Sequence, residues 1–209
     1  KALSSAEPDI LAGTFQSSDV DFSRVSFEMG GAALPAVSRQ DKTVILTLQG
    51  KTPGLEEEIL ALLNTADTLP RKVLGKVNVV TYNPIHYNLV LVPVNDATVP
   101  GGLDAQSIST HLNTVYQQAV VSWNVTMAAG LHVAFKDTFD EGQAGLLSNY
   151  TADMKKVLHA HGELQPGTYY LFLIDTPRNV STLGYMPRGK QAGFVFTGPH
   201  QGDVRKFLK

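Results

Sequence analysis

The chain has 209 residues, of which 43% are hydrophobic and 17% are charged, and its formal net charge is -2. This composition is typical of a folded globular protein and excludes disorder throughout the chain. Because the net charge is close to zero, there is no strong basic field for a polyanion, and we expect no nucleic-acid partner. The lack of cysteine excludes disulfides, thiolate zinc sites and cysteine nucleophiles. No apolar run approaches the roughly 20 residues of a membrane-spanning helix, so we expect no membrane insertion.

Residues 1–82 alternate short apolar runs with Gly, Pro, Ser and Asp, which is typical of strands joined by turns. We expect strands at 25–29, 43–48 and 73–82. Residues 55–63 are ambiguous: Pro53 and three consecutive glutamates favour a helix, whereas the short spacing from the neighbouring strands favours a strand. The region predicts a small β-sandwich-like module that ends at the turn signal Asn83-Pro84.

Residues 83–209 change to a pattern in which apolar strands alternate with segments of helical spacing. A continuous apolar run at 87–94 indicates a strand that is covered on both faces. The further elements expected are a helix at 103–121, a strand at 131–135, a helix at 144–161, a strand at 168–175, a hairpin that reaches residue 197, and a helix that starts at Asp203. This order predicts an α+β fold.

Three pieces of this second region carry a resemblance to a known family. They are Val90-Leu-Val-Pro-Val-Asn95, Leu146-Leu-Ser-Asn-Tyr150, and Gly184-Tyr-Met-Pro-Arg-Gly-Lys190 followed by Gly193-Phe-Val-Phe-Thr197. Together they resemble the run that leads into the active-site helix of zincin-type metallopeptidases, specifically in a group of large secreted bacterial proteins. The resemblance covers roughly residues 77–209.

The resemblance implies a zincin-like mixed β-sheet with backing helices, an edge strand above the cleft, and then the active-site helix. It also favours a strand at 55–63. The helix at 144–161 is an insertion relative to the simplest members. The implied domains are therefore a β-rich module at 1–82 and the N-terminal portion of a zincin-like metallopeptidase domain at 83–209.

In such enzymes two histidines spaced four apart on one helix hold zinc, and the glutamate between them takes a proton from the zinc-bound water. This chain contains no HExxH. The resemblance thus implies that the zinc ligands follow Lys209, and we expect no catalytic residue, metal ligand or cofactor in these residues and no activity from them alone. An alternative is a non-catalytic structural or interaction module of a secreted or cell-surface bacterial protein. An effector or toxin role shares the chemistry and differs in its target.

The resemblance implies a peptide or protein substrate for the full-length protein and an extracellular, cell-surface or periplasmic location. It places a substrate-binding edge strand after the hairpin turn, where unpaired backbone groups would pair with an extended peptide. The residues of that strand are Gln191, Ala192, Gly193, Phe194, Val195, Phe196 and Thr197. Asp203 is expected to cap the active-site helix. Without the rest of that helix, we expect artificial self-association through the exposed cleft face.

The densest group of possible metal ligands, His159 and His161 with Glu163, is interpreted as structural. Alternate spacing directs two imidazoles to one ion on an extended strand, whereas these histidines lie at a predicted helix end. Histidines at that position offset the helix dipole. We therefore expect no native metal site there.

Two groups of charged residues have similarly plain interpretations. Asp137, Asp140 and Glu141 around Gly142 do not match the 12-residue calcium loop, and they indicate a surface turn that also caps the next helix. Basic residues near the end of the chain are interspersed with apolar ones and are interpreted as a solvated face. They are Arg188, Lys190, Arg205, Lys206 and Lys209.

Overall fold

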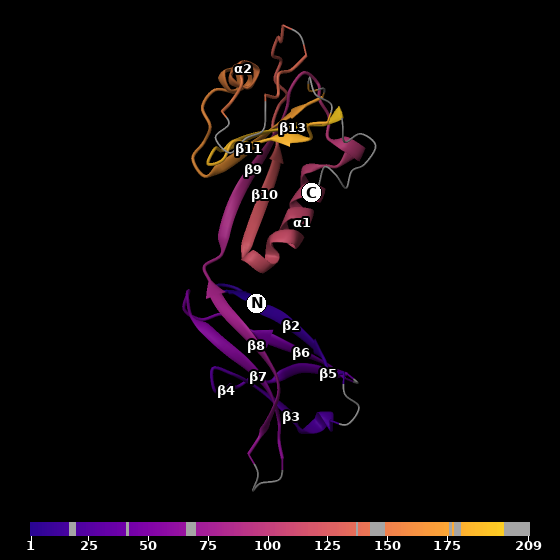
Figure 1. Ribbon diagram of the computed structural model, residues 1–209, viewed down its shortest axis with the longest axis vertical. Helices are drawn as coiled ribbons and strands as arrows, with labels where there is room; N and C mark the ends of the chain where they lie inside the picture. Colours follow the sequence, from indigo (N-terminus) through magenta and orange to yellow (C-terminus); the bar gives the residue numbers. More distant parts are fainter. Residues whose placement is uncertain are drawn as a thin grey trace. The chain divides into compact units, whose positions relative to one another are not determined.

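The computed structural model describes residues 1–16, 20–40, 42–65, 70–136, 138–142, 149–175, 177 and 181–198. The described fold contains two α-helices and three β-sheets, which confirms the predicted α+β class at that coarse level (Figure 1). The chain divides into two compact units, one of residues 1–85 with 116–121 and the other of residues 86–115 with 122–209. The predicted boundary after residue 82 lies near the first point of division, whereas the return of 116–121 to the first unit was not predicted.

The first unit is built from strands in two sheets. A five-stranded sheet has the order β1-β8-β7-β3-β4, and a three-stranded sheet has the order β2-β6-β5. The strands are β1 (Ala2–Ser4), β2 (Asp9–Thr14), β3 (Val25–Met29), β4 (Ala32–Ala33), β5 (Ala36–Gln40), β6 (Thr43–Leu48), β7 (Glu56–Leu63) and β8 (Lys72–Tyr82), with a 3-10 turn η1 (Phe22–Arg24) before β3. Neighbouring strands are antiparallel except for β1 and β8.

Period-two alternation explains why these segments form strands with one buried face. In β6, Val44, Leu46 and Leu48 are buried while the residues between them are more exposed. The buried side chains of both sheets belong to one apolar cluster, made of Leu3, Val25, Phe27, Met29, Val44, Leu46, Leu48, Ile59 and Val79. Both sheets therefore contribute their apolar faces to the same core.

The ambiguous segment at 55–63 forms β7, so the strand interpretation is confirmed. The strand pairs on both sides, with β3 and with β8, and buries Ile59. Two of its glutamates bind lysines: Glu57 accepts a hydrogen bond from Lys51 Nζ and Glu58 accepts one from Lys76 Nζ, each at 2.6 Å. Cross-strand packing thus overrides the helix preference of consecutive glutamates.

The second unit is organised around a five-stranded sheet with the order β10-β9-β11-β13-β12. Its elements are β9 (Ile85–Pro93), α1 (Ala105–Tyr116), β10 (Val121–Met127), α2 (Ala152–His161), β11 (Thr168–Ile174), β12 (Gly184–Tyr185) and β13 (Ala192–Phe196), with a 3-10 turn η2 (Pro100–Gly102). The 3-10 turn η3 (Gln117–Ala119), which follows α1, belongs to the first unit. Strand β11 is parallel to β9 and to β13, and β12 is antiparallel to β13. Side-chain hydrogen bonds join His86 to Ser122 and Asn88 to Asn124. The difference in residue number is the same in both pairs, as it is between parallel strands, so β9 and β10 are also parallel.

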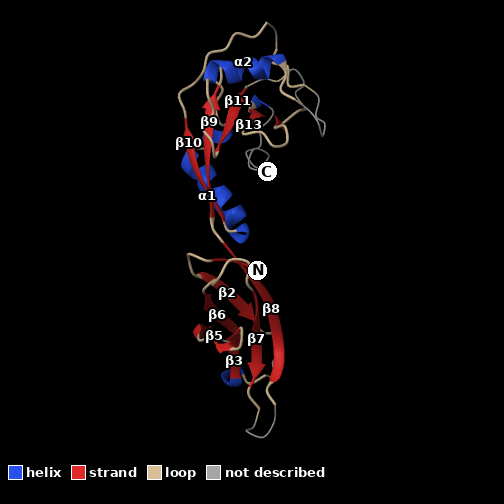
Figure 2. Ribbon diagram, turned by 90° about the vertical axis from the view of Figure 1, so that its left-hand side faces the viewer, coloured by secondary structure: helices blue, strands red, loops and turns tan. Residues whose placement is uncertain are grey.

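The two helices cover opposite faces of this sheet (Figure 2). Helix α2 packs Met154 and Val157 against one face, in a cluster with Phe172 and Phe194. Helix α1 packs Ile108 against the other face, in a cluster with Leu173. Because both faces are covered, β9 and β11 carry nearly continuous apolar runs, as the strand prediction at 87–94 required. Neither helix is long and apolar enough to cross a bilayer among the residues described.

Helix α1 is shorter than the predicted segment of 103–121. Asp104 caps it, because its Oδ1 accepts the Ser107 N–H at 2.7 Å, and hydrogen bonds from the Ser107 hydroxyl and N–H hold the pKa of Asp104 below its usual value. The α-helical part stops at Tyr116 and η3 follows. Val120 then takes a left-handed φ of 56°, which ends the helical path and lets β10 begin.

The strand prediction at 131–135 was wrong, and the true strand β10 was missed. Leu131 forms only an isolated bridge with Val94. The backbone of Val133 is bound instead by the side chain of Asn95, which accepts its N–H at 2.9 Å and donates to its C=O at 2.8 Å. The Asn95 side chain thus binds the backbone groups of Val133 that would otherwise pair with a neighbouring strand.

Helix α2 begins later than the predicted residue 144. Thr151 caps it, because its Oγ1 accepts the Met154 N–H at 3.2 Å. Asn149 and Tyr150 therefore lie before the helix, while residues 143–148 and the predicted helix at Asp203 lie outside the described residues.

Candidate functional site

The histidines at the end of α2 face different surroundings. His159 is exposed, whereas the ring of His161 packs edge-on against Tyr170 and Phe172, with centroid distances of 4.9 and 5.5 Å. Among the residues described, no group of three or more His, Asp or Glu side chains is placed to hold a metal ion. The described side chains therefore offer no donor set that fits zinc.

The acidic turn before α2 is bound to the start of that helix. The Asp140 C=O accepts the Thr151 hydroxyl at 2.7 Å, and the Asp140 N–H donates to Asp153 Oδ2 at 3.1 Å. Asp140 Oδ1 also accepts the Gly142 N–H at 3.0 Å, and Glu141 is buried. Asp137 lies outside the described residues. The turn thus supports the residue that caps α2.

The predicted substrate-binding segment at 191–197 contains β13, but β13 is not an edge strand. Strand β12 pairs along its outer side, where the Phe196 N–H donates to the Leu183 C=O at 3.1 Å. The next outer acceptor, the Ala192 C=O, receives the Tyr150 hydroxyl at 2.7 Å. The expectation that this segment presents a free edge was therefore wrong.

The residues of the predicted site are mostly part of the core. Ala192, Phe194 and Phe196 are buried on the face that α2 covers. On the other face a Cβ added to Gly193 would lie 2.9 Å from Leu171 Cδ2. The ends of the segment are also bound, because the Gln191 amide donates to the C=O of Gln165 and of Thr168, and the N–H and hydroxyl of the buried Thr197 donate to the Ile174 C=O.

Strands β10 and β12 form the two edges of this sheet, and the short strand β12 is the one that lies next to β13. Leu183 and Tyr185 direct their backbone groups toward β13, so alternation directs the N–H and C=O groups of Gly184 and Met186 to the outer side. Gly184 and Met186 are exposed, and no other described strand pairs with this side. We take the outer side of residues 183–186, named here the β12 edge, as the candidate functional site.

Two tyrosines fasten the β12–β13 hairpin to the segment before α2. The Tyr185 hydroxyl donates to the Asn149 C=O at 2.9 Å, while the Tyr150 hydroxyl donates to the Ala192 C=O. Burial raises the pKa of Tyr150. The Tyr185 bond holds the short strand β12 in place, and the Tyr150 bond holds its neighbour β13. The sequence prediction missed the β12 edge because no local pattern indicates which arm of the hairpin lies outermost.

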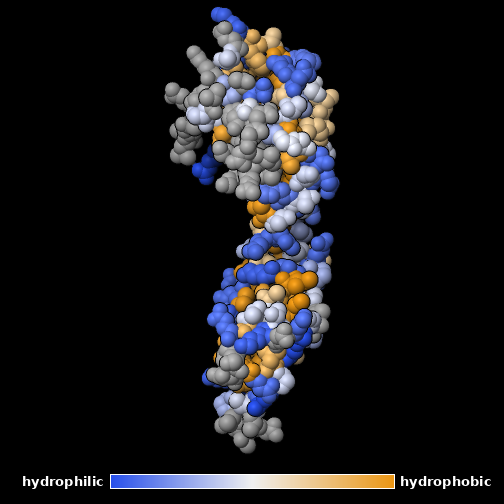
Figure 3. All heavy atoms as spheres, turned by 90° about the vertical axis from the view of Figure 1, so that its right-hand side faces the viewer, coloured by the Kyte–Doolittle hydropathy of each residue, from blue (hydrophilic) through white to orange (hydrophobic). Residues whose placement is uncertain are grey.

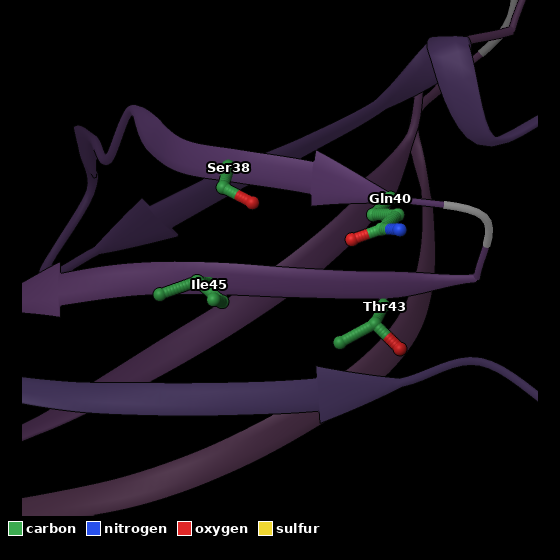
Figure 4. Close-up of a pocket in the computed structure, with 4 residues that line it drawn as sticks. All are labelled: Ser38, Gln40, Thr43 and Ile45. Atoms are coloured by element: carbon green, nitrogen blue, oxygen red, sulfur yellow. The ribbon is translucent and has the colours of Figure 1, made fainter.

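A second surface feature lies in the first unit, on the outer face of the three-stranded sheet. A depression of about 210 Å³ there is lined by Ser38 and Gln40 of β5 and by Thr43 and Ile45 of β6. Figure 4 shows these four side chains on the two neighbouring strands. These side chains are uncharged and include no pair of acid and base. The face in Figure 3 has hydrophobic and hydrophilic residues interspersed over its described surface, so it gives no broad apolar patch that would mark a partner.

The comparisons with known proteins add no family to this geometry. No family model matches the chain, and no curated protein matches it. One similar solved structure is a sialyltransferase from Photobacterium damsela, which is 11% identical with a TM-score of 0.27. The match covers 82% of this chain and 35% of that chain, so this chain spans about a third of its length. A similarity this weak carries no argument about fold or function.

Proposed function

We propose that residues 83–209 are the N-terminal portion of a zincin-like metallopeptidase domain and that residues 1–82 are a β-sandwich-like module in front of it. The complete domain would hydrolyse peptide bonds with a zinc-activated water. In this proposal the zinc ligands and the general base follow Lys209, because the 209 residues contain no HExxH and the described side chains fit no zinc site. The protein would act outside the cytoplasm, in a secreted, surface or periplasmic setting.

The observation that supports this proposal most is the order of the second sheet. The resemblance calls for a mixed sheet, a backing helix, an edge strand and then the active-site helix. Strands β9, β10, β11 and β13 are parallel, the antiparallel β12 lies outside β13, and the chain continues from β13. This mixed sheet with an antiparallel edge strand supports the proposal, although β12 precedes β13 in the chain, whereas the resemblance implies an edge strand directly before the active-site helix.

The β12 edge gives this portion its role in the proposed activity. The outward backbone groups of Gly184 and Met186 can pair with an extended peptide, which would add one strand to the sheet. Gly184 has no side chain to obstruct the approach, and the buried Tyr185 keeps the strand seated against β13. Backbone pairing binds a peptide without requiring a particular side chain at every position, which suits a peptidase.

The proposal for the first unit is supported by its core. Two sheets contribute buried residues to one apolar cluster, which is the arrangement expected of a sandwich. The proposed role of this module is to support or present the peptidase domain.

The deciding experiment uses the natural protein, purified from its source at its natural length. We would measure its intact mass, its metal content and its cleavage of unfolded casein. We expect a chain longer than 209 residues, one equivalent of zinc, and cleavage that a chelator abolishes and zinc restores. A zinc-free protein that cleaves nothing would overturn the peptidase proposal and favour the non-catalytic structural or interaction module.

A further inference from the structure

The turn that follows β12 carries two basic side chains beside the β12 edge. It runs from Pro187 to Lys190, and the Lys190 N–H donates to the Pro187 C=O at 3.2 Å. Gly189 has a φ of 72° at the third position, a conformation that favours glycine. Pro187 is buried, whereas Arg188 and Lys190 are exposed. The turn is therefore anchored at its start and presents two cations to solvent.

Among the described residues, no carboxylate forms an ion pair with either cation. The ion pairs among the described residues involve Lys1, Lys51, Arg71, Lys76 and Lys156. Arg188 and Lys190 take part in none of them. Two positive charges on one four-residue turn, with no ion-pair partner among the described residues, make a local positive potential.

The position of the turn relates this potential to the β12 edge. Met186, whose backbone groups face outward, is two residues from Arg188. At no more than about 3.6 Å of chain per residue, the Cα atoms of Met186 and Arg188 are at most roughly 7 Å apart. It is within the Debye length of about 8 Å at physiological ionic strength, so the turn acts on charges at that end of the strand. A peptide that pairs with Gly184 and Met186 and continues past Met186 runs beside Arg188 and Lys190.

We infer that the turn Pro187–Lys190 makes the β12 edge select extended peptides that carry an acidic residue beyond the Met186 end of the strand. This inference rests on the proposed function, because it assumes that the β12 edge pairs with a peptide. Arg188 supplies a guanidinium that can bind a carboxylate through two N–H groups, and Lys190 adds a mobile ammonium. Both groups are exposed, so their combined effect is modest, at about two- to tenfold in affinity.

The test compares two matched peptides on the full natural protein. Each is an extended ten-residue Thr/Val peptide with a fluorophore, and one has Glu where the other has Gln at the flanking position, with both ends of the peptide tried in turn. We expect the Glu peptide to bind about two- to tenfold more tightly at one end only, and the difference to vanish as salt rises from 50 to 500 mM.

Variants assign the preference to the turn. In Arg188→Gln/Lys190→Gln the Glu and Gln peptides should bind equally, with the affinity for the Gln peptide unchanged. Lys136→Gln/Lys155→Gln removes two exposed charges elsewhere in the same unit and should keep the preference. A preference that survives in Arg188→Gln/Lys190→Gln, or is lost equally in the control, would overturn the inference.

A separate readout distinguishes failure of this inference from failure of the proposed function. Peptide-induced shifts of the Gly184 and Met186 amide signals report binding at the β12 edge whether or not the protein is an enzyme. Zinc and cleavage with equal binding of both peptides would overturn the charge preference and leave the peptidase proposal in place. Absence of any shift at these amides would overturn the inference at its first step, whatever the zinc content.

Discussion

Arg39 shows how one side chain closes a turn onto a sheet in the first unit. Its guanidinium donates to the C=O of Phe22 at 2.9 Å and of Val25 at 2.6 Å. It also lies over the rings of Phe22 and Phe27, with its Cζ 5.7 and 5.6 Å from their centroids. A lysine cannot reproduce the planar fork that makes these contacts together.

We predict that Arg39→Lys lowers the free energy of unfolding by about 1–2 kcal/mol, through loss of one hydrogen bond and of cation–π contact. Arg24→Lys is the matched control, because Arg24 is an exposed residue of the same turn, and it should change stability by less than about 0.5 kcal/mol. Urea unfolding measures both. Equal losses in the two variants would show that Arg39 has no special role.

Gly193 is required by close packing rather than by its backbone angle. A Cβ at this position would lie 2.9 Å from Leu171 Cδ2 and 3.3 Å from Met186 Cβ. The Leu171 side chain can shift, but Met186 approaches through its Cβ, close to the β12 backbone. A substitution therefore disturbs the seating of the β12 edge on β13.

We predict that Gly193→Ala destabilises the second unit by about 1–3 kcal/mol, the usual cost of overpacking. The control is Gly75→Ala, since Gly75 lies on an exposed strand position with no atom within 4 Å of an added Cβ. It should leave stability unchanged or raise it by up to about 1 kcal/mol. Thermal unfolding followed by circular dichroism would decide, and a stable Gly193→Ala protein would contradict the packing analysis.

At the scale of single elements, the start of α2 depends on an ionised carboxylate. Burial raises the pKa of Asp153, but hydrogen bonds from Lys156 Nζ at 2.8 Å and from the Asp140 N–H at 3.1 Å, with the lysine charge, together hold that pKa below its usual value. The folded state thus favours the charged form. Its stabilising contribution is present above the unfolded carboxyl pKa of about 3.9 and is lost as the pH falls through the lower folded value.

We predict that the free energy of unfolding falls below about pH 4 and that Asp153→Asn removes part of this fall. The variant should be less stable than the parent at pH 7 and closer to it at pH 2. Asp96→Asn is the control, because Asp96 is exposed and its left-handed φ of 63° is one that Asn tolerates. Urea unfolding at the two pH values gives the comparison, and parallel curves for parent and Asp153→Asn would refute it.

Helix α1 is fastened to β10 by one amide side chain. Asn113 Oδ1 accepts the Trp123 N–H at 2.6 Å, and its Nδ2 donates to the Trp123 C=O at 3.0 Å. Ser109 Oγ donates to the same carbonyl at 2.9 Å. The amide thus takes the place of a neighbouring strand along the outer side of β10.

We predict that Asn113→Ala costs about 1–3 kcal/mol, because the partly buried Trp123 N–H loses its acceptor. Thr114→Ala, on the exposed side of the same helix, should cost far less. Trp123 is the one tryptophan of the chain, so its fluorescence directly reports unfolding around the hydrogen bonds between Asn113 and Trp123. An Asn113→Ala variant with unchanged stability would mean that the hydrogen bond from Ser109 is enough to hold α1 against β10.

For the whole molecule, the exposed β12 edge favours self-association. Leu183 and Met186 are 42% and 46% exposed beside outward backbone groups, and such an edge is a template for pairing with another chain. We predict reversible self-association of the 209-residue chain at millimolar concentration, measured by sedimentation velocity. Met186→Lys should weaken it, because a lysine on an edge strand opposes pairing. A monomer at the same concentration would contradict this prediction.

The α+β class and most strands were predictable because burial leaves a periodic trace in the residues themselves. Val44, Leu46 and Leu48 alternate, and the run at 87–94 is apolar on both faces. The strand β10 was not predictable in this way, because its start depends on the left-handed turn at Val120 and its partner β9 is distant in sequence.

The candidate site depended on structure more than the core did. The hairpin after β11 was predictable from local residues, since Pro187, Gly189 and the flanking apolar runs are turn and strand signals. Which arm of that hairpin is outermost follows from the three-dimensional fold, because strand order arises from parallel pairing of β13 with β11 across the intervening chain. Local propensity acts within a few residues, whereas an edge is defined by the neighbour that a strand lacks, and that depends on the whole sheet.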